Sequence, residues 1–216
     1  MSYAFENGVL NVVVNPVTDQ SSYYNRLGNN RFGNSFNNDL MQRSLVRDLG
    51  SDYNKSSGAR FYTDRDADRS NRDIDWVIDI TWQDLDVPYP QTNQYSKNVS
   101  REIQEGTDST GKATYKTVYA TLYITRKYFT ARGQLECRIT DAHTRDNIDI
   151  KRYTSSVDWQ QEYGTYQGDS RALSNQDLAF LNNNYYQSPR KEDILNELYQ
   201  KIYPQLKNGI FNLVQW

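Results

Sequence analysis

Polar and apolar residues alternate almost without interruption from Tyr115 to Trp159. The alternation is clearest where Thr and Tyr separate four apolar residues: Val118, Ala120, Leu122 and Ile124. A period of two is typical of β-strands, because successive side chains point to opposite faces of a sheet. The segment therefore predicts strands with one buried face and one polar face that bears tyrosines.

Turn residues are expected to divide this segment into three strands. Thr130 to Gly133 predicts the first turn and Ala142 to Asn147 the second, after which Ile148 and Ile150 begin a strand that Val157 and Trp159 extend. Short apolar or alternating runs predict three earlier strands, at 9–14, 59–63 and 76–82.

Helical spacing of apolar residues appears in two other regions. The first runs from Phe36 to Leu49, and Gly50 is placed to end it. The second follows Ser188-Pro189 and contains Pro204, which should kink or divide that helix. A short helix is also predicted between them, with Ser174 as its cap and Asp177 at the capping-box position.

The order of these elements predicts an α+β fold, a two-layer sandwich of a mixed or antiparallel sheet with flanking helices. A chain of 216 residues fits a single domain over 1–216. Three polar segments, near 18–38, 91–112 and 160–188, predict long loops, and for 91–112 a hairpin excursion is the alternative.

The composition excludes some classes of function. Hydrophobic residues make up 37% of the chain, and the 13% of aromatic residues can still supply a buried core. A formal net charge of −2 with interspersed signs argues against a general nucleic-acid or membrane-surface binder. No apolar run reaches the roughly 20 residues that a membrane-spanning helix needs.

Several segments together carry a resemblance to a known family. They are the opening strand at Val9–Val14, the helix ending in Leu49-Gly50, the strand Asp75–Thr81, the hairpin Leu135–Ile148 and the closing helix. This succession resembles the bacterial envelope family that contains the curli-export lipoprotein, the lipoprotein activators of peptidoglycan synthases and the N-terminal domain of the Tol-system β-propeller protein. The chain departs from the family pattern where Arg145-Asp146 replaces the usual turn glycine.

The resemblance implies a non-enzymatic assembly or adaptor protein in the periplasm or at the outer membrane. No cofactor and no metal are expected. The partner would be another envelope protein or a second copy of the chain, and any membrane attachment would use a lipid anchor upstream of these residues.

The polar sheet face offers the most readable candidate surface. Tyr119 and Tyr123 lie on it, and Glu136 and Arg138 are expected on the same side of the neighbouring strand. Tyrosine and arginine are favoured in protein interfaces because they bury area while keeping a polar group. Trp82, beside two acids, is a further candidate and the best anchor for the alternative of a carbohydrate-binding module.

Other chemistry has weaker support in the sequence. Acidic and hydroxyl residues from Asp64 to Asp75 follow the spacing of a calcium loop, but Arg69 stands where that loop needs glycine, which favours a solvated charged loop. A glycoside-processing enzyme would need two facing carboxylates, and the candidates are Asp79, Asp84, Asp86 and Glu136. Single-stranded RNA could be held by the basic residues Lys116, Arg126, Lys127 and Arg132. Cys137 reads as a buried apolar residue rather than a nucleophile paired with His143.

Overall fold

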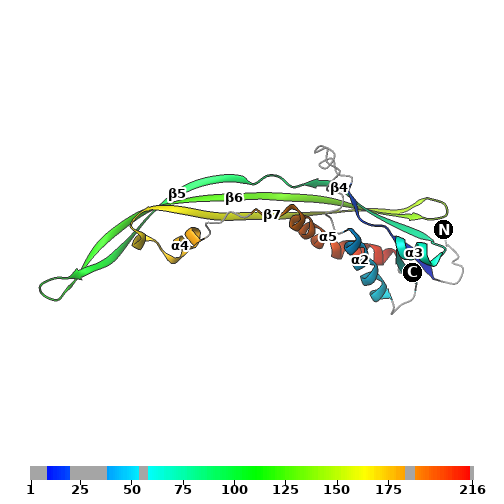
Figure 1. Cartoon of the computed structure of the whole chain (residues 1–216), viewed down its shortest axis with the longest axis horizontal. Helices are drawn as coiled ribbons and strands as arrows, with labels where there is room; N and C mark the ends of the chain where they lie inside the picture. The colour runs from blue at the N-terminus through cyan, green and yellow to red at the C-terminus, as the bar shows by residue number, and fades with distance from the viewer. Residues whose placement is uncertain (1–8, 20–37, 54–57, 183–187, 215–216) are drawn as a thin grey trace. The chain divides into compact units, whose positions relative to one another are not determined.

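The computed structural model describes residues 9–19, 38–53, 58–182 and 188–214 (Figure 1). Within them the chain forms the elements β1 (Leu10–Val14), β2 (Thr18–Asp19), α2 (Asn38–Tyr53), β3 (Ala59–Thr63), α3 (Asp64–Ser70), β4 (Trp76–Asp86), β5 (Gln91–Thr107), β6 (Ala113–Asp141), β7 (Asn147–Gly168), η2 (Ser170–Ala172), α4 (Asn175–Asn182) and α5 (Lys191–Val214). The α+β class is confirmed, because the described residues form helices and one mixed sheet of seven strands. Five strands lie in the order β3-β1-β4-β6-β5. Of the other two, β2 pairs with β4 and β7 pairs with β6.

The chain divides into two compact units. Unit 1 comprises Met1–Val87, Ala131–Val157 and Arg190–Trp216, and unit 2 comprises Pro88–Thr130 and Asp158–Pro189. The longest strand, β6, contributes residues 131–141 to unit 1 and residues 113–130 to unit 2.

Unit 1 is a sheet covered on one face by helices. β1 pairs in parallel with β3 and β4, and β4 pairs antiparallel with β6. The alternate residues Trp76, Ile78, Ile80 and Trp82 of β4 are buried, as are Leu135, Cys137 and Ile139 of β6. Figure 1 shows α2 and α5 on the same side of these strands, and the apolar stripe of α5 is buried from Ile194 to Val214.

Unit 2 is built from β5, residues 113–130 of β6 and residues 158–168 of β7, together with η2 and α4. β5 and β6 form a long antiparallel hairpin whose register runs from Gln91 opposite Tyr128 to Thr107 opposite Ala113. Val118 and Ala120 of β6 pack with Ala172 and Leu173 in a small core, against which Leu181 of α4 also packs. Helical elements therefore cover one face of this hairpin.

The predicted turn at Thr130 to Gly133 is wrong, because β6 runs through it without a break. The buried apolar positions of β6 are even-numbered from Val118 to Ile124 and odd-numbered from Phe129 to Ile139. This change of parity coincides with the boundary between the two units. A shift in the alternation of buried apolar residues therefore does not require a turn.

At 91–112 the hairpin excursion, one of the two alternatives, is confirmed, because residues 91–107 form β5 and pair with β6. The predicted loop at 160–188 is wrong in large part, because β7 continues to Gly168 before η2 and α4 begin. Both segments are polar because much of their surface is exposed, which hides the alternation that identifies a strand. Most of the predicted loop at 18–38 lies outside the described residues, and its first two residues form β2.

The predicted helices differ from the structure mainly at their ends. The start predicted at Phe36 lies outside the described residues, and α2 continues through Gly50 to Tyr53. α5 begins at Lys191 and is not divided at Pro204. The cap at Ser174 and the strands at 59–63 and 76–82 are confirmed.

The predicted turn after Asp141 is confirmed and has a clear local cause. The Asp141 carboxylate accepts the backbone N–H groups of His143 and Thr144, both at 2.9 Å. These bonds hold the pKa of Asp141 below its ordinary value. Arg145 has a φ of 64° in this turn, a left-handed conformation in which glycine is usual.

Two tyrosines of α5 provide a matched test of the packing between α5 and α2. The Tyr203 hydroxyl donates to Asp48 of α2 at 2.6 Å, whereas the buried Tyr199 hydroxyl has no hydrogen-bond partner among the described residues. We expect Tyr203→Phe to lower the free energy of unfolding by about 1 kcal/mol, because it removes a made hydrogen bond.

Tyr199→Phe should leave the free energy of unfolding unchanged or raise it, because it removes a buried polar group that makes no bond. Urea denaturation of both variants measures the difference. A larger loss for Tyr199→Phe than for Tyr203→Phe would contradict this assignment of the two hydroxyls.

Candidate recognition surface

The open face of the β5–β6 hairpin carries the tyrosines predicted from the sequence to lie on a polar face. Tyr119 and Tyr123 of β6 are 68% and 47% exposed, and Tyr115 on the same alternation is 60% exposed. Tyr119 lies opposite Ser100 of β5, and Tyr123 lies opposite Ser96. Residues directly opposite in an antiparallel pair share a face of the sheet. The rings therefore stand beside small side chains and remain accessible.

This surface, called here the tyrosine face, is almost free of charge. It comprises the even-numbered residues 94–104 of β5 and the odd-numbered residues 115–125 of β6. Its side chains are amides, hydroxyls and tyrosines, and the only charged residue in this set is Glu102. Thr121 donates to Asn98 across the two strands at 2.9 Å, and such cross-strand bonds help to order the polar part of the face.

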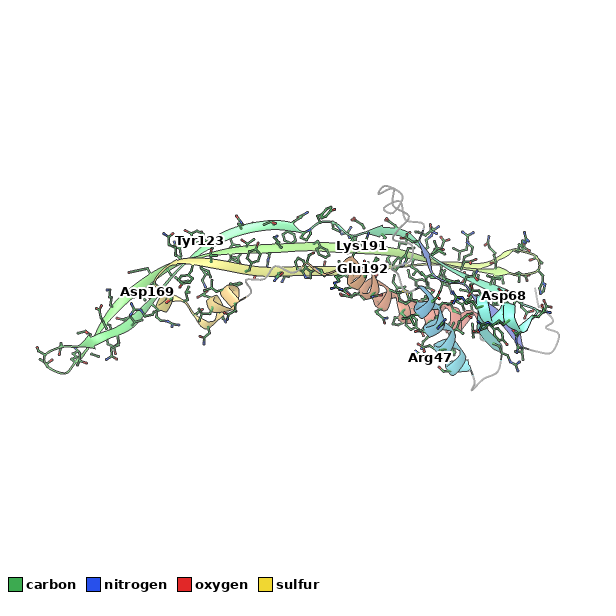
Figure 2. All side chains as sticks on the ribbon, viewed as in Figure 1. Arg47, Asp68, Tyr123, Asp169, Lys191 and Glu192 are labelled. Carbon is green, nitrogen blue, oxygen red and sulfur yellow. The ribbon has the colours of Figure 1, made fainter. Side chains whose placement is uncertain are left out.

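A shallow hollow of about 360 Å³ lies at one end of the tyrosine face. Three consecutive residues from each of three strands line it, namely 94–96 of β5, 123–125 of β6 and 163–165 of β7. Tyr163 and Thr165 were not selected from the sequence, because 160–188 was expected to be a loop. Figure 2 shows Tyr123, one of the lining residues, on β6.

Contacts on the opposite side fix the hairpin to its helical cover. Lys97 of β5 donates to Asp177 of α4 at 3.0 Å, and the Asp177 side chain is 3% exposed. The same carboxylate accepts the backbone N–H of Ser174 at 2.9 Å and its hydroxyl at 2.6 Å. The Ser174 bonds, and then Lys97, lower the pKa of Asp177 to about 2. The anchored helix leaves the tyrosine face as the open side of the hairpin.

Glu136 and Arg138 do not join the tyrosine face. They belong to the same strand as the tyrosines, not to a neighbouring one, and they lie in unit 1. Glu136 is buried and accepts from Arg138 at 3.1 Å and from Arg152 at 3.0 Å. Arg138 and then Arg152 hold the pKa of Glu136 below its ordinary value. An ionised, doubly paired carboxylate is a structural ion pair and is poorly suited to act as a general acid.

Trp82 is buried in the unit 1 core, with 2% of its surface exposed. The prediction that it anchors a sugar or a partner is therefore wrong. Its ring lies over Gly133 of β6, where an added Cβ would come within 2.6 Å of the ring. The alternation in β4 places Trp82 on the same side as Ile80, which is also buried.

The acidic segment from Asp64 to Asp75 forms no calcium loop. Its first part is helix α3, and Asp68 on this helix is labelled in Figure 2. Asp64 accepts from Gln42, Asp66 accepts from Thr63, and Asp75 accepts from the backbone of Asn11, so three acids are bound in separate places. In the described part of the chain, no three His, Cys, Asp or Glu residues are placed to hold a metal ion.

Four of the remaining candidates are buried or paired with a neighbour. Burial raises the pKa of the Cys137 thiol to about 12, which removes the thiolate that a nucleophile needs. Asp79 accepts from the Asn15 amide at 2.7 Å. Lys116 pairs with Glu105 and Arg126 with Glu162, which neutralises two basic residues considered for RNA. No helix within the described ranges is long and apolar enough to cross a membrane.

Comparisons with known proteins give no family assignment. No protein-family model and no curated protein matches the chain. Among solved structures, the chain is similar to a protein described as a neuraminyllactose-binding hemagglutinin homolog from Helicobacter pylori, with 10% identity, a TM-score of 0.34, and coverage of 97% of this chain and 87% of that one. It is also similar to lipoprotein GNA1162 from Neisseria meningitidis, with 10% identity, a TM-score of 0.27, and coverage of 92% and 99%. Similarity at this level carries no argument about function.

Proposed function

We propose that this chain is a non-enzymatic protein of the bacterial cell envelope that acts as an assembly or adaptor protein by recognising another protein. The observation that carries the proposal is the tyrosine face of unit 2, which presents accessible rings among uncharged hydroxyls and amides. The order of strands and helices, which resembles the curli-export and synthase-activator family, supports the envelope setting, periplasmic or at the outer membrane. The partner is an envelope protein or a second copy of the chain.

The tyrosine face is a better candidate for contact with a partner protein than the free edge of β5. The edge strand carries Lys97, Arg101, Glu102 and Glu105. Charged side chains on an edge strand oppose pairing with a strand from another molecule. Aromatic rings on an open face, by contrast, can be buried against a partner while their hydroxyls keep hydrogen bonds.

Tyr119→Ser combined with Tyr123→Ser should weaken partner binding or self-association by at least roughly tenfold, because two exposed rings are removed from the centre of the contact. Sedimentation velocity measures self-association. Retention of envelope proteins on the immobilised chain, competed by soluble native protein, measures partner binding. Since Glu102 is the only charge on the face, raising the salt concentration should change binding only slightly.

Tyr89→Ser is the matched control, because Tyr89 is 91% exposed and lies outside the tyrosine face. It should bind like the native chain, and all variants should keep the native circular dichroism. Binding that survives in the double variant, or that falls equally in Tyr89→Ser, would remove the tyrosine face as the recognition surface.

Carbohydrate binding is a second candidate, favoured by the hollow where Tyr123 and Tyr163 stand among hydroxyl and amide groups. Tyrosine rings can stack on sugar rings while such groups donate and accept hydrogen bonds. Retention of the native chain on a polysaccharide column, lost in Tyr123→Ser, would support this function. Absence of retention would leave protein recognition as the proposed function.

A further inference from the structure

A second hollow, of about 310 Å³, lies in unit 1 and is independent of the tyrosine face. Its lining comes from the start of α2, the end of β3, and α3; the residues are Asp39, Gln42, Arg43, Thr63, Arg65, Asp66 and Arg69. Three of these seven side chains are guanidinium groups. None of the functions considered above uses them.

The arginines differ in how they are paired. Arg65 makes an ion pair with Asp39 at 3.2 Å. Arg43 and Arg69 are exposed and make no ion pair with any residue in the described ranges. Two guanidinium groups therefore line the hollow with their hydrogen-bond donors available.

The acids of the hollow are already bound to neighbours. Asp66 accepts from the Thr63 hydroxyl at 2.7 Å, and Asp39 is occupied by Arg65. The buried Gln42 amide donates to the Val14 carbonyl at 2.7 Å and to Asp64 at 2.8 Å, which fixes this wall of the hollow. The lining thus has an excess of one positive charge, and both of its carboxylates have partners other than Arg43 and Arg69.

We propose that this hollow binds a phosphate group through Arg43 and Arg69. The planar guanidinium fork matches the oxygens of phosphate, and a doubly charged oxyanion gains from two such groups. The phosphate could belong to a soluble molecule or to a lipid headgroup, since both present the same oxygens.

Isothermal titration of the full chain with inorganic phosphate, at constant ionic strength against chloride, tests this site. We expect saturable binding that weakens at least roughly tenfold in Arg43→Gln with Arg69→Gln. Asp39→Asn should strengthen binding several-fold, because it removes a negative charge and releases Arg65. A purely structural role for these arginines would not produce opposite effects from the two changes.

Arg60→Gln is the matched control. Arg60 is exposed on β3, and it lies on the opposite face of this strand from Thr63, which lines the hollow. This variant should bind phosphate like the native chain.

Sedimentation with phosphatidylglycerol vesicles, compared with phosphatidylcholine vesicles, shows whether the phosphate belongs to a lipid headgroup. Binding to phosphatidylglycerol vesicles that is lost in the double variant assigns a lipid headgroup. Failure of both phosphate and vesicles to bind, or equal binding by native and double-variant chains, would overturn the proposal. The tyrosine face is untouched by these variants, so this outcome leaves the proposed function intact.

Discussion

Trp82→Ala is expected to lower the free energy of unfolding by about 3–5 kcal/mol, the usual cost of removing a large aromatic side chain from a packed core. Trp82 is 2% exposed on β4 and lies opposite Leu135 of β6. Its ring occupies the space over Gly133. Any residue other than glycine at position 133 would place a Cβ within 2.6 Å of the ring and force it to move. Removing the ring leaves a cavity in unit 1 that small shifts of neighbouring residues cannot fill.

Chemical denaturation, followed by circular dichroism, measures this effect. Tyr119→Ala is the control, since a side chain that is 68% exposed should change the free energy of unfolding by no more than roughly 0.5 kcal/mol. Equal losses in the two variants would contradict the assignment of Trp82 to the core and of Tyr119 to the surface.

Asp177→Ala should lower the free energy of unfolding by about 2 kcal/mol, because it removes a helix cap and leaves the partners of a buried carboxylate unpaired. Asp177 accepts from Ser174 at the start of α4 and from Lys97 of β5. Lys97→Met should lower the free energy of unfolding by less than Asp177→Ala does, because the hydrogen bonds between Asp177 and Ser174 remain. Hydrogen exchange over residues 175–182 should rise most in Asp177→Ala, and unchanged exchange there would contradict the anchoring role.

The same contact gives a pH dependence with a defined sign. The pKa of Asp177 falls from about 3.8 to about 2 in the folded chain. A lowered carboxyl pKa means that the stabilisation is fully present above about pH 4 and is lost as the pH falls toward 2. The difference in free energy of unfolding between native and Asp177→Asn chains should therefore be large at pH 7 and shrink below pH 3. A difference that grows on acidification would contradict this contact.

Most strands of unit 1 and the general fold class could be predicted from the sequence, because these strands carry regularly placed apolar residues. β4 shows this in Trp76, Ile78, Ile80 and Trp82, all of which are buried. The continuity of β6 could not be predicted in the same way. Its apolar positions change parity between Ile124 and Phe129, and a turn near Thr130 is the simplest explanation when only the sequence is known.

β5 could be predicted only as one of two alternatives, a hairpin excursion or a loop, and the physical reason differs from that for β6. One of its faces belongs to the open tyrosine face and the other is only partly covered, so Val99 and Ile103 are its only partly buried apolar residues. The spacing of Tyr95, Val99 and Ile103 is the only signal in the sequence, and it fits a helix as well as a strand. Tyr163 and Thr165 could not be predicted as lining residues of the hollow, because their part of β7 was expected to be a loop.

Site-specific photocrosslinking tests most directly whether the tyrosine face is the recognition surface. A benzophenone amino acid would replace Tyr119 or Tyr123, and Ile150, which is 43% exposed in unit 1, would be the control position. We predict a crosslink to an envelope protein or to a second copy of the chain from positions 119 and 123 but not from 150. Excess native chain should suppress the crosslink, whereas the Tyr119→Ser, Tyr123→Ser variant should not. Equal crosslinking from all three positions, or none from 119 and 123 while 150 reacts, would contradict the proposed surface.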